Sequence, residues 1–296
     1  MRLFDTARAE VVAFEPGPLV TMYSCGITPY DAAHLGHAAV YVFFDMLQRR
    51  LQDAGYETRC VRNVTDVDDD ILRKARELGV HYLDLAAENG GHPDDPNKRD
   101  PLDFVLWQPS LPDEPAWESR WGPGRPGWHI ECSALVLREL GETIDIHGGG
   151  RDLVFPHHEC ETAQSESVTG RQFARLWFHV GLVSLGGTKM SKSLGNLVFV
   201  GDLCKEWDPM AVRLALLSHH YRADWDWRTG EDMPAAATRL ALWASAPGVD
   251  GAEGLDAVRV ALDDDLDTPG AVAALDEEAK AGRAVAAGAA LLGIAL

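Results

Sequence analysis

Four side chains in two short motifs have the chemistry needed to stabilise phosphoryl transfer. His34 and His37 stand three positions apart in H-L-G-H, and Lys189 and Lys192 stand three apart in K-M-S-K-S. Imidazole and ammonium groups can donate hydrogen bonds to the charge that develops on a phosphate under attack. We therefore take these four as candidate catalytic residues, the histidines at the α-phosphate of ATP and the lysines at its pyrophosphate.

The H-L-G-H motif lies where a strand is predicted to end and a helix to begin. Residues 19–24 form a short apolar run, and apolar residues recur at helical spacing from about residue 33 to residue 54. Ligands of open α/β sheets bind at the carboxyl ends of strands, and a first helical turn offers N–H groups to phosphate. Gly36 would let a flat adenine ring approach the backbone. An isolated H-x-x-H would as often cap a helix or bind a metal, and a lone K-M-S-K-S would be a solvated charge pair.

Strands and helices alternate through the first two thirds of the chain. Further strands are predicted at 57–64, 143–146 and 178–183, and further helices at 67–78, 130–140 and 157–169. This pattern predicts an α/β domain with a parallel sheet over residues 1–190. Only helical signals follow from about residue 199, so residues 191–296 are predicted to carry the K-M-S-K-S loop and a small all-helical domain.

Composition argues against a nucleic-acid partner, a membrane partner and export from the cytoplasm. The 46 acidic residues outnumber the 27 Lys and Arg residues, which gives a formal charge of −19 and disfavours binding a polyanion through diffuse electrostatics. No apolar run reaches the roughly 18 residues of a membrane helix. The N-terminus lacks the pattern of a signal or transit peptide. We expect a cytoplasmic protein without a membrane partner, and a monomer.

The motifs taken in order resemble those of the class I aminoacyl-tRNA synthetases, and within that class the cysteine branch. The segments that carry the resemblance are CGITPYD (25–31), RNVTDVDD (62–69), GWHIEC (127–132), FPHHECE (155–161) and KMSKSLGN (189–196). The resemblance covers most of the chain. It implies a Rossmann-like fold of the HUP type with helices on both faces of the sheet, and activation of L-cysteine by ATP with Mg²⁺.

The resemblance also implies a zinc site. Its ligands would be Cys25, Cys132, His157 and Glu161, although the position of Glu161 in the ligand set is open. Thiolate, imidazole and carboxylate all suit tetrahedral zinc, and the last two residues share one face of a predicted helix. A substrate thiolate could join the zinc, which would discriminate cysteine from serine.

The same resemblance assigns the two substrate pockets. We expect the cysteine pocket to include Thr28, Asn63, Thr65 and Trp128. We expect the H-G-G-G segment at 147–150 to form a turn close to the nucleotide. The implied ATP-binding residues are His34, Gly36, His37, Gly150, Arg151, Asp152, Lys189, Met190, Ser191, Lys192 and Ser193.

Two kinds of member of this branch share the adenylation step and differ in the acceptor. One transfers cysteine to tRNA, and the other joins it to the amine of glucosaminyl-inositol in mycothiol biosynthesis. The segments at 27–29, 88–93 and 291–296 resemble the sugar ligases, and only 103 residues follow Ser193, too few for a tRNA-anticodon domain. Glu161 and the segment 163–166 look more like the tRNA enzymes. We favour the sugar acceptor.

One departure concerns a connecting insertion that members of both kinds carry. Here most of it is missing near residues 86–98, while the signature motifs survive on either side. A shortened ligase, or an inactive copy that only binds zinc or cysteine, would fit this pattern. The intact histidines and lysines favour the enzyme.

Overall fold

A computed structural model describes residues 1–26, 33–64, 104–112, 114–190, 194–246 and 252–296. The helix expected at 67–78 lies outside these residues, as does the segment where the insertion is missing.

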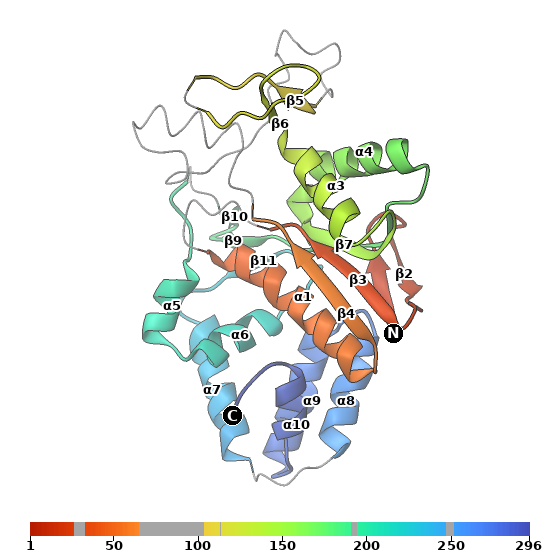
Figure 1. Ribbon diagram of the computed structural model, residues 1–296. Coiled ribbons are helices and arrows are strands. Elements are labelled where there is room, and N and C mark those ends of the chain that lie inside the picture. Colours follow the sequence, from red (N-terminus) through yellow and green to blue (C-terminus); the bar gives the residue numbers. More distant parts are fainter. Residues whose placement is uncertain (27–32, 65–103, 113, 191–193, 247–251) are drawn as a thin grey trace.

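A parallel sheet of four strands, in the order β4-β3-β7-β8, forms the centre of the molecule (Figure 1). The strands are β3 (Leu19–Ser24), β4 (Glu57–Arg62), β7 (Ile144–Gly150) and β8 (Ala174–Val180). All neighbouring pairs are parallel. Because β7 is hydrogen-bonded on both edges and buried along most of its length, its sequence need not alternate. The predicted parallel α/β sheet is confirmed.

Helices cover both faces of this sheet (Figure 1). On one face lies α1 (Leu35–Asp53), whose apolar stripe buries residues such as Phe43 and Leu47 against the sheet. On the other lie α3 (Trp128–Glu139) and α4 (Glu159–Thr169). A short 3₁₀ turn (Arg151–Leu153) and a π turn (Val154–His158) connect β7 to α4.

Helices account for most of the last third of the described chain. They are α5 (Val200–Glu206), α6 (Pro209–Leu217), α7 (Asp232–Ser245), α8 (Ala252–Asp263), α9 (Thr268–Lys280) and α10 (Ala286–Leu291). Both α6 and α10 pack against α1, so one hydrophobic core runs from the sheet into the helices. The division of the chain at residue 190 stays a prediction.

Several short strands were not predicted. They form a hairpin of β1 (Arg2–Asp5) with β2 (Glu10–Ala13), a pair of β5 (Trp107–Gln108) with β6 (Arg125–Pro126), and a sheet of β9 (Val183–Leu185), β10 (Thr188–Lys189) and β11 (Trp225–Trp227). The expectation of helices alone after residue 199 is therefore wrong at β11. Two tryptophans there alternate with a polar residue and suit a strand edge.

The H-G-G-G segment is also corrected: it lies inside β7 and is no turn. A Cβ at Gly148 would lie 1.6 Å from the carbonyl oxygen of Phe178 on β8. Only glycine allows that approach, so the glycines mark tight packing of two strands rather than a bend.

Candidate active site

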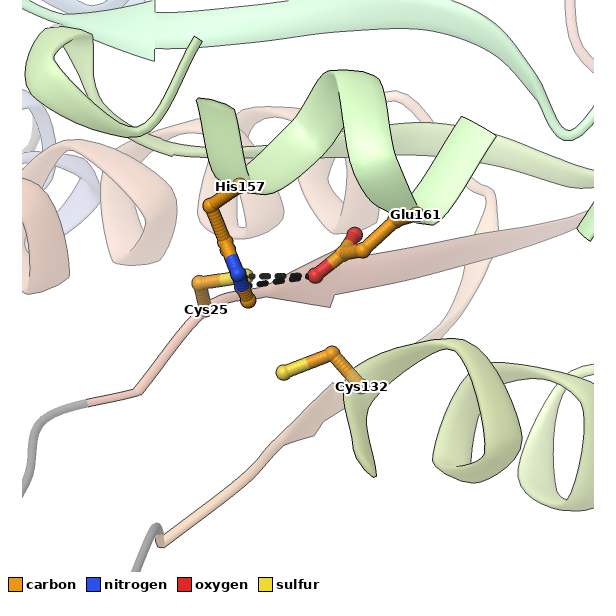
Figure 2. Close-up of side chains that lie close together, drawn as sticks. All are labelled: Cys25, Cys132, His157 and Glu161. Atoms are coloured by element: carbon orange, nitrogen blue, oxygen red, sulfur yellow. Dashed lines mark hydrogen bonds and ion pairs between the residues drawn. The ribbon is translucent and has the colours of Figure 1, made fainter. Parts of the chain in front are cut away.

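Four buried side chains converge beyond the carboxyl end of β3 (Figure 2). Cys25 follows β3, Cys132 comes from α3, His157 from the π turn and Glu161 from α4. One ligand atom from each lies within 4.8 Å of the others. The four residues that the sequence predicts as metal ligands are thus brought together.

The spacing within this cluster suits a zinc ion. The Cys25 Sγ atom lies 3.4 Å from His157 Nε2 and 3.6 Å from Glu161 Oε1. Ligand atoms on a tetrahedral zinc lie about 3.4–3.6 Å apart, from zinc–ligand bonds of about 2.0–2.3 Å. The His157 Nε2 to Glu161 Oε1 distance of 2.7 Å is shorter and is that of an ion pair.

Burial and mutual contacts decide which of the four side chains carry a charge. A hydrogen bond with Cys25 lowers the pKa of Cys132 to about 6, whereas burial raises the pKa of Cys25 well above 9.0. Burial opposes ionisation of Glu161, but the charges of His147 and His157 hold its pKa well below 4.5. Burial lowers the pKa of His157, and Glu161 and Cys132 outweigh it and raise the pKa to about 10. A divalent cation would replace the proton on His157 and meet two anionic ligands, so the donor set fits zinc.

Close backbone packing places Cys25. Its N–H donates to the carbonyl of Gly148 at 2.9 Å. A Cβ at Gly149 would lie 3.5 Å from the Cys25 Cβ. On the other side, the Gly26 N–H donates to the Asn63 side chain at 2.7 Å. Asn63, which the sequence places in the cysteine pocket, therefore also fixes the turn after Cys25.

Trp128 lies directly against the cluster, as the predicted pocket wall should. Its half-buried ring stacks on His157 with centroids 4.4 Å apart and planes at 17°. Gly127 before it is required, because a Cβ there would lie 2.0 Å from the Val105 carbonyl oxygen. The other two predicted pocket residues, Thr28 and Thr65, lie outside the described residues.

The two histidines of H-L-G-H stand at the start of α1. His34 is the N-cap, and its Nδ1 accepts from the Gly36 N–H at 3.0 Å. The rings of His34 and His37 lie 3.8 Å apart between centroids. A Cβ at Gly36 would lie 2.8 Å from the His34 ring, so this glycine is also needed to seat the cap.

Backbone pairing brings the two signature motifs together. The Leu35 N–H donates to the Val198 carbonyl at 2.9 Å, and the Val200 N–H donates to the Ala33 carbonyl at 3.0 Å. The segment just after K-M-S-K-S is thereby joined to the start of α1. Ser191, Lys192 and Ser193 lie outside the described residues.

Charged residues that the sequence predicts at the nucleotide lie in the 3₁₀ turn after β7 and in β10. The Lys189 ammonium contacts Asp152 at 2.9 Å, and Arg151 contacts Asp224 at 2.8 Å. A Cβ at Gly150 would lie 2.5 Å from the Asp152 carboxylate. Met190 is buried. Both cations are therefore paired with carboxylates.

The family model for the catalytic domain of class I (C) tRNA synthetases matches residues 15–89 and 81–237. That match covers both signature motifs and all four cluster residues. The chain belongs to the class I aminoacyl-tRNA synthetase family. The fold agrees: Mycobacterium tuberculosis methionyl-tRNA synthetase in complex with methionyl-adenylate has a TM-score of 0.57 at 13% identity, covering 93% of this chain and 82% of that one.

Curated relatives of this class I chain share the name L-cysteine:1D-myo-inositol 2-amino-2-deoxy-alpha-D-glucopyranoside ligase. The Streptosporangium roseum protein is 40% identical over 97% of this chain and 90% of its own length. The Acidothermus cellulolyticus protein is 43% identical over 93% of this chain and 88% of its own length. The Nakamurella multipartita protein is 41% identical over 100% of this chain and 95% of its own length.

These alignments also show the missing insertion. The Nakamurella multipartita alignment spans 387 positions, 91 more than the 296 residues of this chain. The family match breaks into two stretches that overlap at 81–89. This synthetase-family chain therefore lacks a segment that its relatives carry, as the sequence predicts.

Sequence reasoning missed a second layer of histidines around the cluster. His129 contacts His157, and His147 contacts Glu161. His158 lies 3.3 Å from Cys25 and 2.7 Å from His179. Burial lowers the pKa of His129 to about 4 and that of His179 to about 3. The available signal was their abundance, because four histidines besides His157 lie between residues 129 and 179. Only the fold shows that they meet.

Proposed function

We propose that this chain is an ATP-dependent, AMP-forming ligase that activates L-cysteine and transfers it to the amine of glucosaminyl-inositol. The observation that carries the proposal is the buried Cys25, Cys132, His157 and Glu161 cluster beside the H-L-G-H end of α1. The names of the 40–43% identical relatives support the acceptor.

The metal site would select the amino acid. Zinc held by the four residues would bind the thiolate of the substrate, and serine's hydroxyl is a much poorer ligand. Trp128, stacked on His157, would cover the cysteine side chain and exclude water from it. Glu161 would complete the ligand set when cysteine is absent.

The first half-reaction would form the adenylate. A carboxylate oxygen of cysteine attacks the α-phosphorus of magnesium-bound ATP, and the bond to pyrophosphate breaks. His34 and His37 would donate hydrogen bonds to the α-phosphate oxygens, and Lys189 and Lys192 would bind the departing pyrophosphate. Lys189 must leave Asp152 to do so, which exchanges one anionic partner for another.

The second half-reaction would use the sugar amine. Its neutral nitrogen would attack the carbonyl carbon of cysteinyl-AMP, and the bond from that carbon to the phosphate oxygen would break. AMP and one proton from the amine would leave as the amide forms. The net charge of −19 suits a neutral or cationic small acceptor better than tRNA.

ATP–pyrophosphate exchange tests the proposal. We expect exchange with cysteine and little with serine or without amino acid, on protein loaded with about one zinc per chain. Glucosaminyl-inositol and tRNA are then compared as acceptors. Zinc-loaded protein that shows no exchange would contradict the proposed enzymatic activity and indicate a relative that only binds its ligands. Transfer of cysteine to tRNA alone would contradict the proposed sugar acceptor.

A further inference from the structure

Two histidines outside the predicted ligand set each contact one ligand on the side that faces away from the cluster. His157 points Nε2 at Cys25 and Glu161, and its Nδ1 lies 2.7 Å from the Nδ1 of His129. Glu161 points Oε1 at His157, and its Oε2 is bonded to the Nε2 of His147. All are buried.

We propose that His129 and His147 are positioning residues that aim the metal-binding atoms of His157 and Glu161. The inference rests on the zinc site of the proposed function. Partners of metal ligands hold the ring or carboxylate in the orientation that binding requires, and their loss typically lowers metal affinity about 10- to 100-fold.

The contact between two Nδ1 atoms determines the direction of the first hydrogen bond. One atom must donate and the other accept. A neutral imidazole that binds a metal through Nε2 carries its proton on Nδ1, so His157 is the donor. His129 must therefore accept through Nδ1, and its own proton stands on Nε2.

In the second hydrogen bond, between His147 and Glu161, the outer histidine is the donor. The Nδ1 of His147 is buried and has no hydrogen-bond partner among the residues that the structure describes. A proton there would be buried unpaired, which is unfavourable. His147 therefore carries its proton on Nε2 and donates to Glu161 Oε2, which holds Oε1 on the side of His157 and the cluster.

A second reading of the same residues is a separate metal site. Cys25, His147, His158 and Glu161 also lie within 4.8 Å of one another. Cys25 and Glu161 belong to the first set as well, and the first set offers two thiols where this one offers one, which favours the first set as the zinc site. The geometry therefore points to an outer layer around one metal.

Replacing each histidine by asparagine or glutamine tests the two hydrogen bonds. Asparagine Oδ1 can occupy the place of a histidine Nδ1, and glutamine Nε2 the place of a histidine Nε2. His129→Asn and His147→Gln therefore keep the required group, whereas His129→Gln and His147→Asn misplace it. Zinc affinity is measured by chelator competition on each full-length variant, with the visible absorption of the cobalt-substituted protein as a second readout of ligand geometry.

We expect zinc affinity within about threefold of the unaltered protein for the matched amides, and about 10- to 100-fold lower for the mismatched ones with a changed cobalt spectrum. Equal affinity in all four variants, or equal loss in matched and mismatched pairs, would overturn the inference while the zinc site stands. Failure of the unaltered protein to bind zinc would overturn the proposed function as well.

Discussion

At the scale of single residues, burial decides what the cluster can do. Cys132 and Glu161 are fully buried, and both are held ionised by their neighbours. Buried anions are costly unless they are paired, so this cluster is suited to a cation. Cys204, by contrast, is exposed and belongs to neither of the metal-binding groups found among the described residues.

Removal of one thiolate should empty the site. For Cys132→Ser we expect zinc content to fall from about one ion per chain to below about 0.2, because a hydroxyl is a poor zinc ligand. Zinc is measured by elemental analysis after dialysis, with Cys204→Ser as the control that keeps its metal. Full zinc content in Cys132→Ser would contradict the ligand assignment.

At the scale of elements, the site depends on how closely β7 runs beside β8 and the end of β3. Gly148 provides the carbonyl that accepts from Cys25, and faces the Phe178 backbone where a side chain cannot fit. The same strand then leads through Arg151 and Asp152 to the π turn that carries His157. One strand thus connects the nucleotide side and the metal side.

Gly148→Ala should be severely destabilising. The added Cβ would overlap backbone that cannot move without separating β7 from β8, so we expect a loss of more than about 3 kcal/mol in the free energy of unfolding. Urea denaturation measures it. Gly201→Ala, with nothing within 4 Å of the new Cβ, is the control and should be neutral or slightly stabilising. Comparable stability of the two variants would contradict the packing argument.

The end of α1 is joined to α8 by an ion pair that should respond to pH. The hydrogen bond from Arg259 lowers the pKa of Asp53 below 3.8 in the folded state. A lowered folded pKa gives stability that is present above 3.8 and is lost as the pH falls through the folded pKa.

Asp53→Asn should therefore unfold more easily than the unaltered protein at neutral pH, and the difference should shrink below pH 3.8. Urea denaturation across this range measures the difference. A gap that stays constant or widens as the pH falls would show that the charge of Asp53 does not act in this way.

At the scale of the whole molecule, Asp265 joins three distant parts. Its carboxylate accepts from the Phe4 N–H at 2.8 Å and the Tyr221 hydroxyl at 2.7 Å, and it pairs with Arg222. Arg222 in turn offers its carbonyl to Arg151 of the predicted nucleotide site. The N-terminal hairpin, the helices and the site are thereby held in one arrangement.

Loss of this carboxylate should weaken the whole fold. For Asp265→Ala we expect the free energy of unfolding to fall by about 3 kcal/mol. The buried Tyr221 hydroxyl and the half-buried Phe4 N–H lose their acceptor, and the exposed Arg222 loses its ion-pair partner. The backbone also has a φ of 58° that alanine adopts poorly. Asp265→Asn keeps an acceptor and tolerates this φ, so it should recover much of the loss. Thermal unfolding of the two variants is compared with that of Asp264→Ala, an exposed neighbour that should change little.

Much of the function is readable from the sequence because its signals are local. The spacing of His34 and His37 before a helix, the strand at 19–24 that the structure confirms, and the i, i+4 pair of His157 and Glu161 each depend on residues near one another in the chain. Such short-range patterns follow from helix and strand periodicity alone.

What only the tertiary structure decided depends on contacts between distant segments. The convergence of Cys25, Cys132 and His157, the outer histidines and the pairing of residue 35 with residue 198 require the sheet to be assembled. The glycines of β7 show most clearly where prediction from local sequence fails. By local preference they resemble a turn, but they lie in a strand that closely approaches the Phe178 backbone. Backbone packing across a sheet outweighs local preference.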